Sequence, residues 1–130
     1  MSARRSAIDR LFAGELLEDI LRQLDMEEGA DREWAAATAA TIRAKSPLSL
    51  KIALAQVRRG RNWSFEDCMV HEFRIVSRIV YGHDFYEGVR AVIVDKDTAP
   101  RWKPADLADA ADADVERHFA PLAADELVLP

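Results

Sequence analysis

Apolar residues recur every three or four positions in several stretches of the chain, which predicts amphipathic helices. Two such helices are expected in the first 45 residues. One spans residues 16–26 and has leucine and isoleucine on one face and charged side chains on the other. The second spans residues 32–45, is rich in alanine, and follows Asp31, which can cap it.

Three more helices are expected between residues 46 and 95, and the first two carry capping signals. Ser46 and Pro47 suit the N-cap and the first position of a helix. Ser64 and Asp67 resemble a capping box at the start of the longest helix, which is expected to end at Gly82. The expected buried line of the first of these helices consists of Leu50, Leu54 and Val57.

The fifth helix is expected at residues 85–94, where Asp84 and Glu87 repeat the capping pattern. The β-branched run at 89–94 is also typical of a strand, but the start signal favours a helix. Gly88 allows another segment to approach closely. Structural roles are therefore expected for Asp84, Glu87 and Gly88.

Residues 96–130 are expected to form an extended segment, a short acidic helix and a docked tail. Pro100 and Pro104 restrict the extended segment on either side of Trp102, and Phe85 and Trp102 are expected to clamp it. The chain has neither an internal repeat nor a convincing β-hairpin signal. The whole is predicted to be a single all-α unit of five to six helices.

The composition narrows the function classes. The 130 residues are 49% hydrophobic and carry a formal net charge of -5, which argues against nucleic acid as a partner. No apolar stretch reaches the roughly 20 residues of a membrane span, so no membrane partner is expected. Cys68 is the only cysteine, which excludes an intrachain disulfide and a Cys-based zinc site and favours a reducing, cytoplasmic location.

Few side chains suggest chemistry of their own. The spacing of His71, His83 and His118 does not suit a zinc site, so no metal is expected. His71 is expected on a polar helix face, His83 near a helix end, and Cys68 as a buried structural thiol. Neither a nucleophile–base pair nor a glycine-rich phosphate loop can be assembled from the spacing, so no catalytic residue is assigned.

Arg58, Arg59 and Arg61 form the densest basic cluster of the sequence. Cations are favoured in the last turn of a helix, which explains the cluster without any ligand. Alternatively the cluster attracts a phosphate or an acidic partner, with Trp63 available to stack. An anion-binding module therefore stays open as a function.

Five stretches together form a family signature. They are IDRLF at 8–12, SPLSLKI at 46–52, HDFYEGVRAVIVDKD at 83–97, PRWKPADL at 100–107 and VERHFAPL at 115–122. In this order they resemble the C-terminal part of 3-hydroxyisobutyryl-CoA hydrolases, which belong to the crotonase, or enoyl-CoA hydratase/isomerase, superfamily. The resemblance covers almost the whole chain.

The resemblance implies a helical region without the catalytic core of ββα units. In the family that core carries the oxyanion hole and the acidic residues, so this chain alone is expected to be inactive. The implied parent activity is hydrolysis of a coenzyme A thioester in valine catabolism, with no tightly bound cofactor. The expected partner is the catalytic core, or a second copy through exposed apolar surface.

Besides the anion-binding module, two alternatives to this function remain open: a stand-alone helical interaction module without catalysis, and a parent that is an enoyl-CoA hydratase or isomerase. For binding, the resemblance implies one residue. In related crotonases a lysine near the end of the matching helix approaches the CoA phosphates, and Lys96 corresponds to it when one inserted residue is allowed. The competing interpretation of Lys96 is a surface lysine flanked by Asp95 and Asp97.

Overall fold

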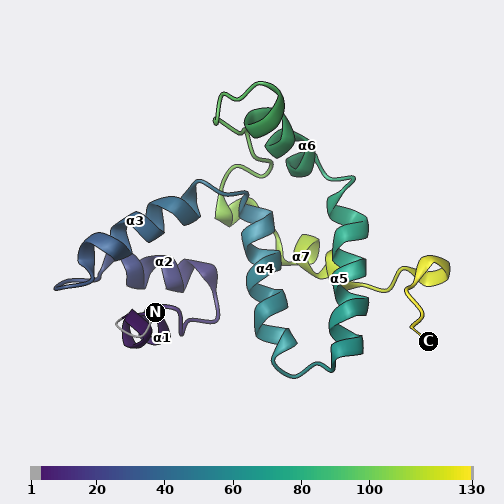
Figure 1. The fold of residues 1–130 in the computed structure, drawn as a ribbon, viewed down its shortest axis with the longest axis horizontal. Coiled ribbons are helices and arrows are strands. Elements are labelled where there is room, and N and C mark those ends of the chain that lie inside the picture. Colours follow the sequence, from purple (N-terminus) through teal and green to yellow (C-terminus); the bar gives the residue numbers. More distant parts are fainter. Residues whose placement is uncertain (1–3, 130) are drawn as a thin grey trace. The chain divides into compact units, whose positions relative to one another are not determined.

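The computed structural model describes residues 4–129, and the regular structure in this range is helical throughout (Figure 1). The predicted all-α class is confirmed, with seven α-helices among the described residues in place of the expected five to six. The chain divides into two compact units, Met1–Lys45 and Ser46–Pro130, where one unit was expected. Within the described residues, no helix is long and apolar enough to span a membrane.

From residue 4 onward, the first unit contains three helices: α1 (Arg5–Leu11), α2 (Leu17–Asp25) and α3 (Arg32–Arg43). The sequence pattern predicted two, because α1 is only seven residues long and buries just Ala7 and Leu11. α2 packs against both α1 and α3. The core of this unit is formed by Ala7, Leu11, Leu17, Ile20, Leu21, Leu24, Ala35 and Ala39.

Asp31 does not cap α3 as predicted. It occupies the N-cap position, but its side chain makes no capping hydrogen bond. Its carboxylate lies 3.7 Å from Nε of Arg4 instead. A cation within the same unit has therefore replaced the backbone N–H groups as its partner.

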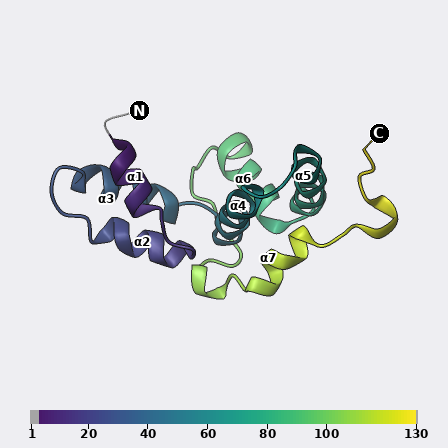
Figure 2. The ribbon, with the colours of Figure 1, turned by 90° about the horizontal axis from the view of Figure 1, so that it is seen from below.

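The second unit is built on α4 (Pro47–Gly60), α5 (Phe65–Ile79) and α7 (Asp112–Phe119). α7 lies against both α4 and α5 (Figure 2). Their buried core consists of Ile52, Ile75, Val115 and Phe119, and the partly buried Leu48, Ala55, Trp63 and Ile79 pack on it.

The predicted buried line of α4 is wrong. Val57 is 65% exposed, and it is the opposite line, with Ile52 at its centre, that enters the core. α4 has apolar residues on both sides, so periodicity alone could not decide which side meets α7. Of the predicted line, Leu50 and Leu54 are half-buried and Val57 is exposed.

Two of the predicted helix starts in this unit, those of α4 and α5, have the side-chain caps that the sequence indicated. Ser46 Oγ accepts a hydrogen bond from the backbone N of Ser49 at 3.2 Å, with Pro47 at the first helical position. Ser64 and Asp67 form the predicted capping box of α5, with distances of 3.0 and 3.2 Å. Gly82 was assigned wrongly: α5 ends with Val80 as its C-cap, and Gly82 is the N-cap of the next helix.

The ambiguous segment after Gly82 is helical. α6 (His83–Val89) continues into a π-helical turn, η2 (Arg90–Val94), where the N–H of Asp95 donates to the carbonyl of Arg90 at 2.8 Å. Short 3-10 turns, η3 (Leu107–Asp109) and η4 (Ala123–Asp125), flank α7. The prediction of a helix over a strand is thus confirmed, although its last turn is wider than an α-helix.

Candidate functional site

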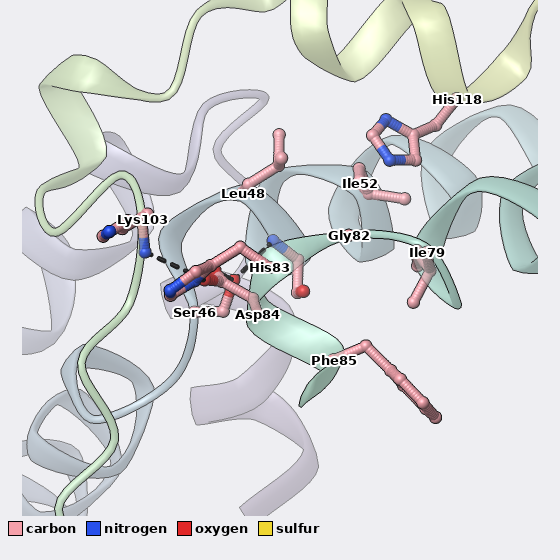
Figure 3. A pocket seen from close by; sticks show the side chains of 11 residues that line it. Ser46, Leu48, Ile52, Ile79, Gly82, His83, Asp84, Phe85, Lys103 and His118 are labelled. Atoms are coloured by element: carbon pink, nitrogen blue, oxygen red, sulfur yellow. Dashed lines mark hydrogen bonds and ion pairs between the residues drawn. The ribbon is translucent and has the colours of Figure 1, made fainter. Parts of the chain in front are cut away.

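The signature residues of the second unit meet around α6, and Asp84 is the centre of one group (Figure 3). Its Oδ2 accepts a hydrogen bond from Ser46 Oγ at 2.5 Å. Its Oδ1 accepts from the backbone N–H of Lys103 at 2.8 Å and lies 2.9 Å from Nδ1 of His83. Asp84 therefore joins the start of α4, the start of α6 and the extended segment after residue 98.

Glu87 is the centre of a second group, one turn further along α6. Arg90 binds both of its carboxylate oxygens, through Nε at 2.9 Å and Nη2 at 2.7 Å. The backbone N–H of Arg101 donates to the same carboxylate at 2.7 Å. The bonds from Arg90, and after them the N–H of Arg101, lower the pKa of Glu87 to about 2.

The predicted capping roles of Asp84 and Glu87 are therefore wrong. The N-cap of α6 is Gly82, and α6 has no side-chain cap. The two carboxylates instead hold the N–H groups of Arg101 and Lys103, which are alternate residues of an extended strand-like segment. Carboxylates three residues apart on a helix face the same side, and this spacing matches the two-residue period of an extended chain.

The acidity of Glu87 leads to a pH prediction. Because its folded pKa of about 2 lies below the ordinary value of 4.5, its contribution to stability is complete above about pH 4.5 and is lost as the pH falls towards 2. Glu87→Gln should therefore lose less stability than wild type between pH 7 and pH 3, measured by urea unfolding. The exposed Glu66, replaced by Gln, serves as the matched control and should keep the wild-type drop. An unchanged drop in Glu87→Gln would contradict the assignment.

Gly88 lies beside the ring of Trp102, but the approach is not so close that it requires a glycine. A Cβ built on Gly88 would lie 3.5 Å from Cη2 of the half-buried Trp102 ring, which is ordinary contact. Phe85 does not clamp the segment in this way, because it is 44% exposed and packs edge-to-face on Tyr86. The extended segment is thus held by the two carboxylates and by the Trp102 ring.

Lys96 lies just beyond the π-helical turn and is exposed. Its backbone is in the left-handed region, with φ of 55°, as is that of Thr98 with φ of 54°. The carboxylates on either side of it both turn to Arg90, Asp95 at 2.7 Å and Asp97 at 2.6 Å. Hydrogen bonds from Arg90, and then from a backbone N–H, lower the pKa of Asp97.

A small cavity borders the Asp84 group (Figure 3). Its volume is about 60 Å³, and Leu48, Ile52, Ile79, Phe85 and His118 contribute to its lining. Sites for small-molecule ligands usually measure roughly 300–1,000 Å³. This cavity is therefore too small to enclose such a ligand.

Arg59 of the basic cluster and the nearby ring of Trp63 both contact the core of this unit, whereas Arg61 is exposed. Arg59 pairs with Glu116 and lies over the Phe119 ring, 4.3 Å from its centroid. Trp63, the expected stacking partner for a ligand, is stacked at 4.0 Å on His71. His71 is thus in contact with the core, contrary to the expectation of a polar face, and burial lowers its pKa first of all.

The positions of the other two histidines and of the cysteine were predicted only in part. His83 begins α6 where it was expected near a helix end. His118 is buried, with Nδ1 2.7 Å from the carbonyl oxygen of Asp114. Cys68 is only half-buried. Among residues 4–129, no group of three or more His, Cys, Asp or Glu side chains could hold a metal ion.

Comparison with known proteins decides the family. A family model described as enoyl-CoA hydratase/isomerase matches residues 1–119. The chain belongs to the enoyl-CoA hydratase/isomerase family. The predicted resemblance is thereby confirmed, and the signature residues around α6 belong to a region shared with this family.

The relatives and solved structures that resemble this chain match nearly all of it, but the match covers only part of each of them. The mitochondrial 3-hydroxyisobutyryl-CoA hydrolase of Gallus gallus is 40% identical over 122 residues, which are 94% of this chain and 31% of that protein. The small ribosomal subunit protein mS47 of Arabidopsis thaliana is 41% identical over 119 residues, 88% of this chain and 29% of that protein. The chain therefore spans about a third of the length of these relatives.

Among solved structures, an enoyl-CoA hydratase from Rhodobacter sphaeroides 2.4.1 matches with a TM-score of 0.87 and 32% identity. The match covers 98% of this chain and 37% of the hydratase. A carnitinyl-CoA dehydratase from Mycobacterium thermoresistibile gives a TM-score of 0.82 at 36% identity, covering 98% and 35% of the two chains. The helical fold is thus one that members of the enoyl-CoA hydratase/isomerase family contain as a part.

Proposed function

We propose that this polypeptide forms the C-terminal helical region of a thioester hydrolase that acts on 3-hydroxyisobutyryl-CoA or a related acyl-CoA in valine catabolism. In this role it packs on the catalytic core of ββα units, here called the catalytic body, and completes it. The observation that carries the proposal is the 40% identity to the Gallus gallus hydrolase across 94% of this chain and 31% of that protein.

The exposed apolar side chains of the second unit support a packing role. Phe65, Met69, Phe73 and Val76 recur every three or four residues along α5 and are exposed. Contiguous apolar surface of this kind marks an interaction site, and covering it is favourable by about 25 cal/mol per Å². Further large apolar side chains are exposed at Val57, Tyr81, Phe85, Tyr86, Val92, Ile93 and Val94.

The catalytic groups of the reaction are assigned to the body. Thioester hydrolysis develops negative charge on the carbonyl oxygen, and preorganised donors must stabilise it. The polar groups around α6 are engaged with one another: Asp84 with Ser46 and Lys103, and Glu87 with Arg90. This chain therefore contributes packing and substrate contact, and coenzyme A enters only as part of the substrate.

For substrate contact we propose that Lys96 approaches a phosphate of coenzyme A. The support is its exposure and its place at the end of the helix that carries the family signature. The acidic neighbours that would weaken its attraction to an anion are both paired with Arg90. The alternative of an unengaged surface lysine is tested below together with Arg90.

The decisive experiment is a chimera in which this chain replaces the matching region of the Gallus gallus hydrolase. Hydrolysis of 3-hydroxyisobutyryl-CoA, followed by thiol release, should be restored in the chimera compared with the hydrolase body lacking that region. The isolated 130-residue chain should stay at background, because losing even one oxyanion donor typically costs about 10²–10³ in rate. A folded chimera no more active than the truncated body would refute the proposal, as would turnover by the isolated chain that survives repurification.

A second candidate function is a helical interaction module without catalysis. It is favoured by the 41% identity to a protein named as a ribosomal subunit component, whose name refers to assembly and not to a reaction. In that case the isolated chain should self-associate or bind its partner regardless of CoA. Sedimentation velocity over a concentration series, with and without CoA, separates this function from the first.

Two further points remain proposals. The parent reaction could be hydration or isomerisation, as the name of the Rhodobacter sphaeroides neighbour suggests, and offering the chimera crotonyl-CoA distinguishes these reactions from hydrolysis.

The location is proposed to be cytoplasmic, whereas the names of the Gallus gallus and Homo sapiens relatives state mitochondrial. Cell fractionation with detection of this chain tests the location.

A further inference from the structure

Arg90 holds three carboxylates of its own segment. Its Nε and Nη2 bind Glu87, and its Nη1 lies 2.7 Å from Asp95 and 2.6 Å from Asp97. Nη2 also donates to the carbonyl of Ala99 at 3.3 Å. One guanidinium therefore fixes the end of α6, the π-helical turn and the start of the extended segment.

The backbone between these contacts places Lys96 at an exposed tip. The hydrogen bond of the π-helical turn η2 spans five residues, one more than in an α-helix, and the N–H of Thr98 closes the loop onto the carbonyl of Ala91 at 3.0 Å. Lys96 has φ of 55°, a left-handed conformation that non-glycine residues rarely adopt. Such conformations persist only where surrounding contacts enforce them, and here Arg90 supplies those contacts on both sides.

The charges around Lys96 would otherwise oppose an anionic ligand. Asp95 and Asp97 are its direct neighbours, and their ion pairs are with Arg90 at 2.7 and 2.6 Å. Without the guanidinium, the two carboxylates would be free to pair with the ammonium group of Lys96. A lysine held in such pairs attracts a phosphate less strongly.

We infer that Arg90 is a positioning residue, which keeps Lys96 available to a phosphate of coenzyme A by engaging the two carboxylates that flank it. This inference rests on the proposed phosphate contact of Lys96. Arg90 itself does not touch the substrate. Its effect should therefore depend on the phosphates of the substrate and on the charges of Asp95 and Asp97.

The test compares two thioesters of the same acyl group in the active chimera. One is the coenzyme A thioester, and the other is the pantetheine thioester, which lacks the phosphates. Lys96→Ala should raise KM for the CoA thioester about tenfold and leave KM for the pantetheine thioester unchanged. Arg90→Gln should raise KM for the CoA thioester by about fivefold, with kcat retained.

A charge-based rescue separates positioning from a merely structural role. Adding Asp95→Asn and Asp97→Asn to Arg90→Gln removes the released carboxylates and should return KM for the CoA thioester towards the wild-type value. Arg117→Gln is the matched control, because Arg117 pairs with Asp114 on α7. This substitution should change neither the KM for the CoA thioester nor the KM for the pantetheine thioester.

The outcomes identify which idea fails. If Lys96→Ala raises KM selectively for the CoA thioester but Arg90→Gln does not, the positioning role alone is wrong. If Arg90→Gln raises both KM values equally and the added substitutions give no rescue, its role is structural and the inference is also overturned. If Lys96→Ala changes neither KM, the proposed phosphate contact is refuted, and the inference with it.

Discussion

Replacement of Phe119 by alanine is expected to lower the free energy of unfolding of the second unit by about 3–5 kcal/mol. Phe119 is 5% exposed and lies at the end of α7. It packs with Ile52, Ile75 and Val115, so the substitution leaves a cavity shared by three helices. Its ring also lies 6.3 Å from Trp63 and below the guanidinium of Arg59 at 4.3 Å, contacts that alanine cannot replace.

The measurement is urea unfolding of the 130-residue chain, followed by circular dichroism. Phe65→Ala is the matched control: it removes the same ring from α5, where Phe65 is 74% exposed, and should cost less than about 0.5 kcal/mol. If Phe119→Ala does not fold, Phe119→Leu should still fold and show a smaller loss. Equal losses at positions 119 and 65 would contradict the assigned core.

Asp84→Ala is expected to lower the free energy of unfolding by about 3 kcal/mol. The carboxylate accepts hydrogen bonds from Ser46 Oγ and from the backbone N–H of Lys103, and its side chain is only 13% exposed. Hydrogen bonds to charged groups contribute roughly 1.5–3 kcal/mol each, and the losses at one carboxylate are not additive. The substitution also leaves the N–H of Lys103 without its acceptor.

Amide hydrogen exchange provides a local measurement for Asp84. Exchange at Lys103 should accelerate strongly in Asp84→Ala and less in Asp84→Asn, which retains one acceptor oxygen. Asp106→Ala, at an exposed aspartate of the same connecting segment, should leave both stability and exchange at Lys103 near wild type. Unchanged exchange at Lys103 in Asp84→Ala would show that Asp84 does not hold this segment.

Local signals predicted the parts of the fold whose partners lie within one helical turn. The caps at Ser46 and Ser64 depend on N–H groups three residues away, and both form as predicted. The helical class of the 85–94 run was also predicted from its start signal. At both caps the sequence neighbours themselves supply the partner, whereas the 85–94 run is helical without the side-chain cap that its start signal indicated.

Predictions failed where a local partner competed with a distant one. Asp84 and Glu87 carry the spacing of a capping box, yet their partners Lys103 and Arg101 lie 19 and 14 residues further on. His71 was placed on a polar face, but the fold brings it onto Trp63. A capping signal states only that a side chain can accept N–H groups, and the fold determines which N–H groups are nearest.

By itself the sequence determined the helical class, the family and the residues that bear its signature, because these follow from periodicity, short-range hydrogen bonds and the order of motifs. Only the tertiary structure decided that Ile52, and not Val57, enters the core, and that Arg90 binds Glu87, Asp95 and Asp97 around Lys96. The physical reason is that a helix with two apolar faces and a cluster of alternating charges each allow several pairings of similar energy. Packing of distant segments selects one of them.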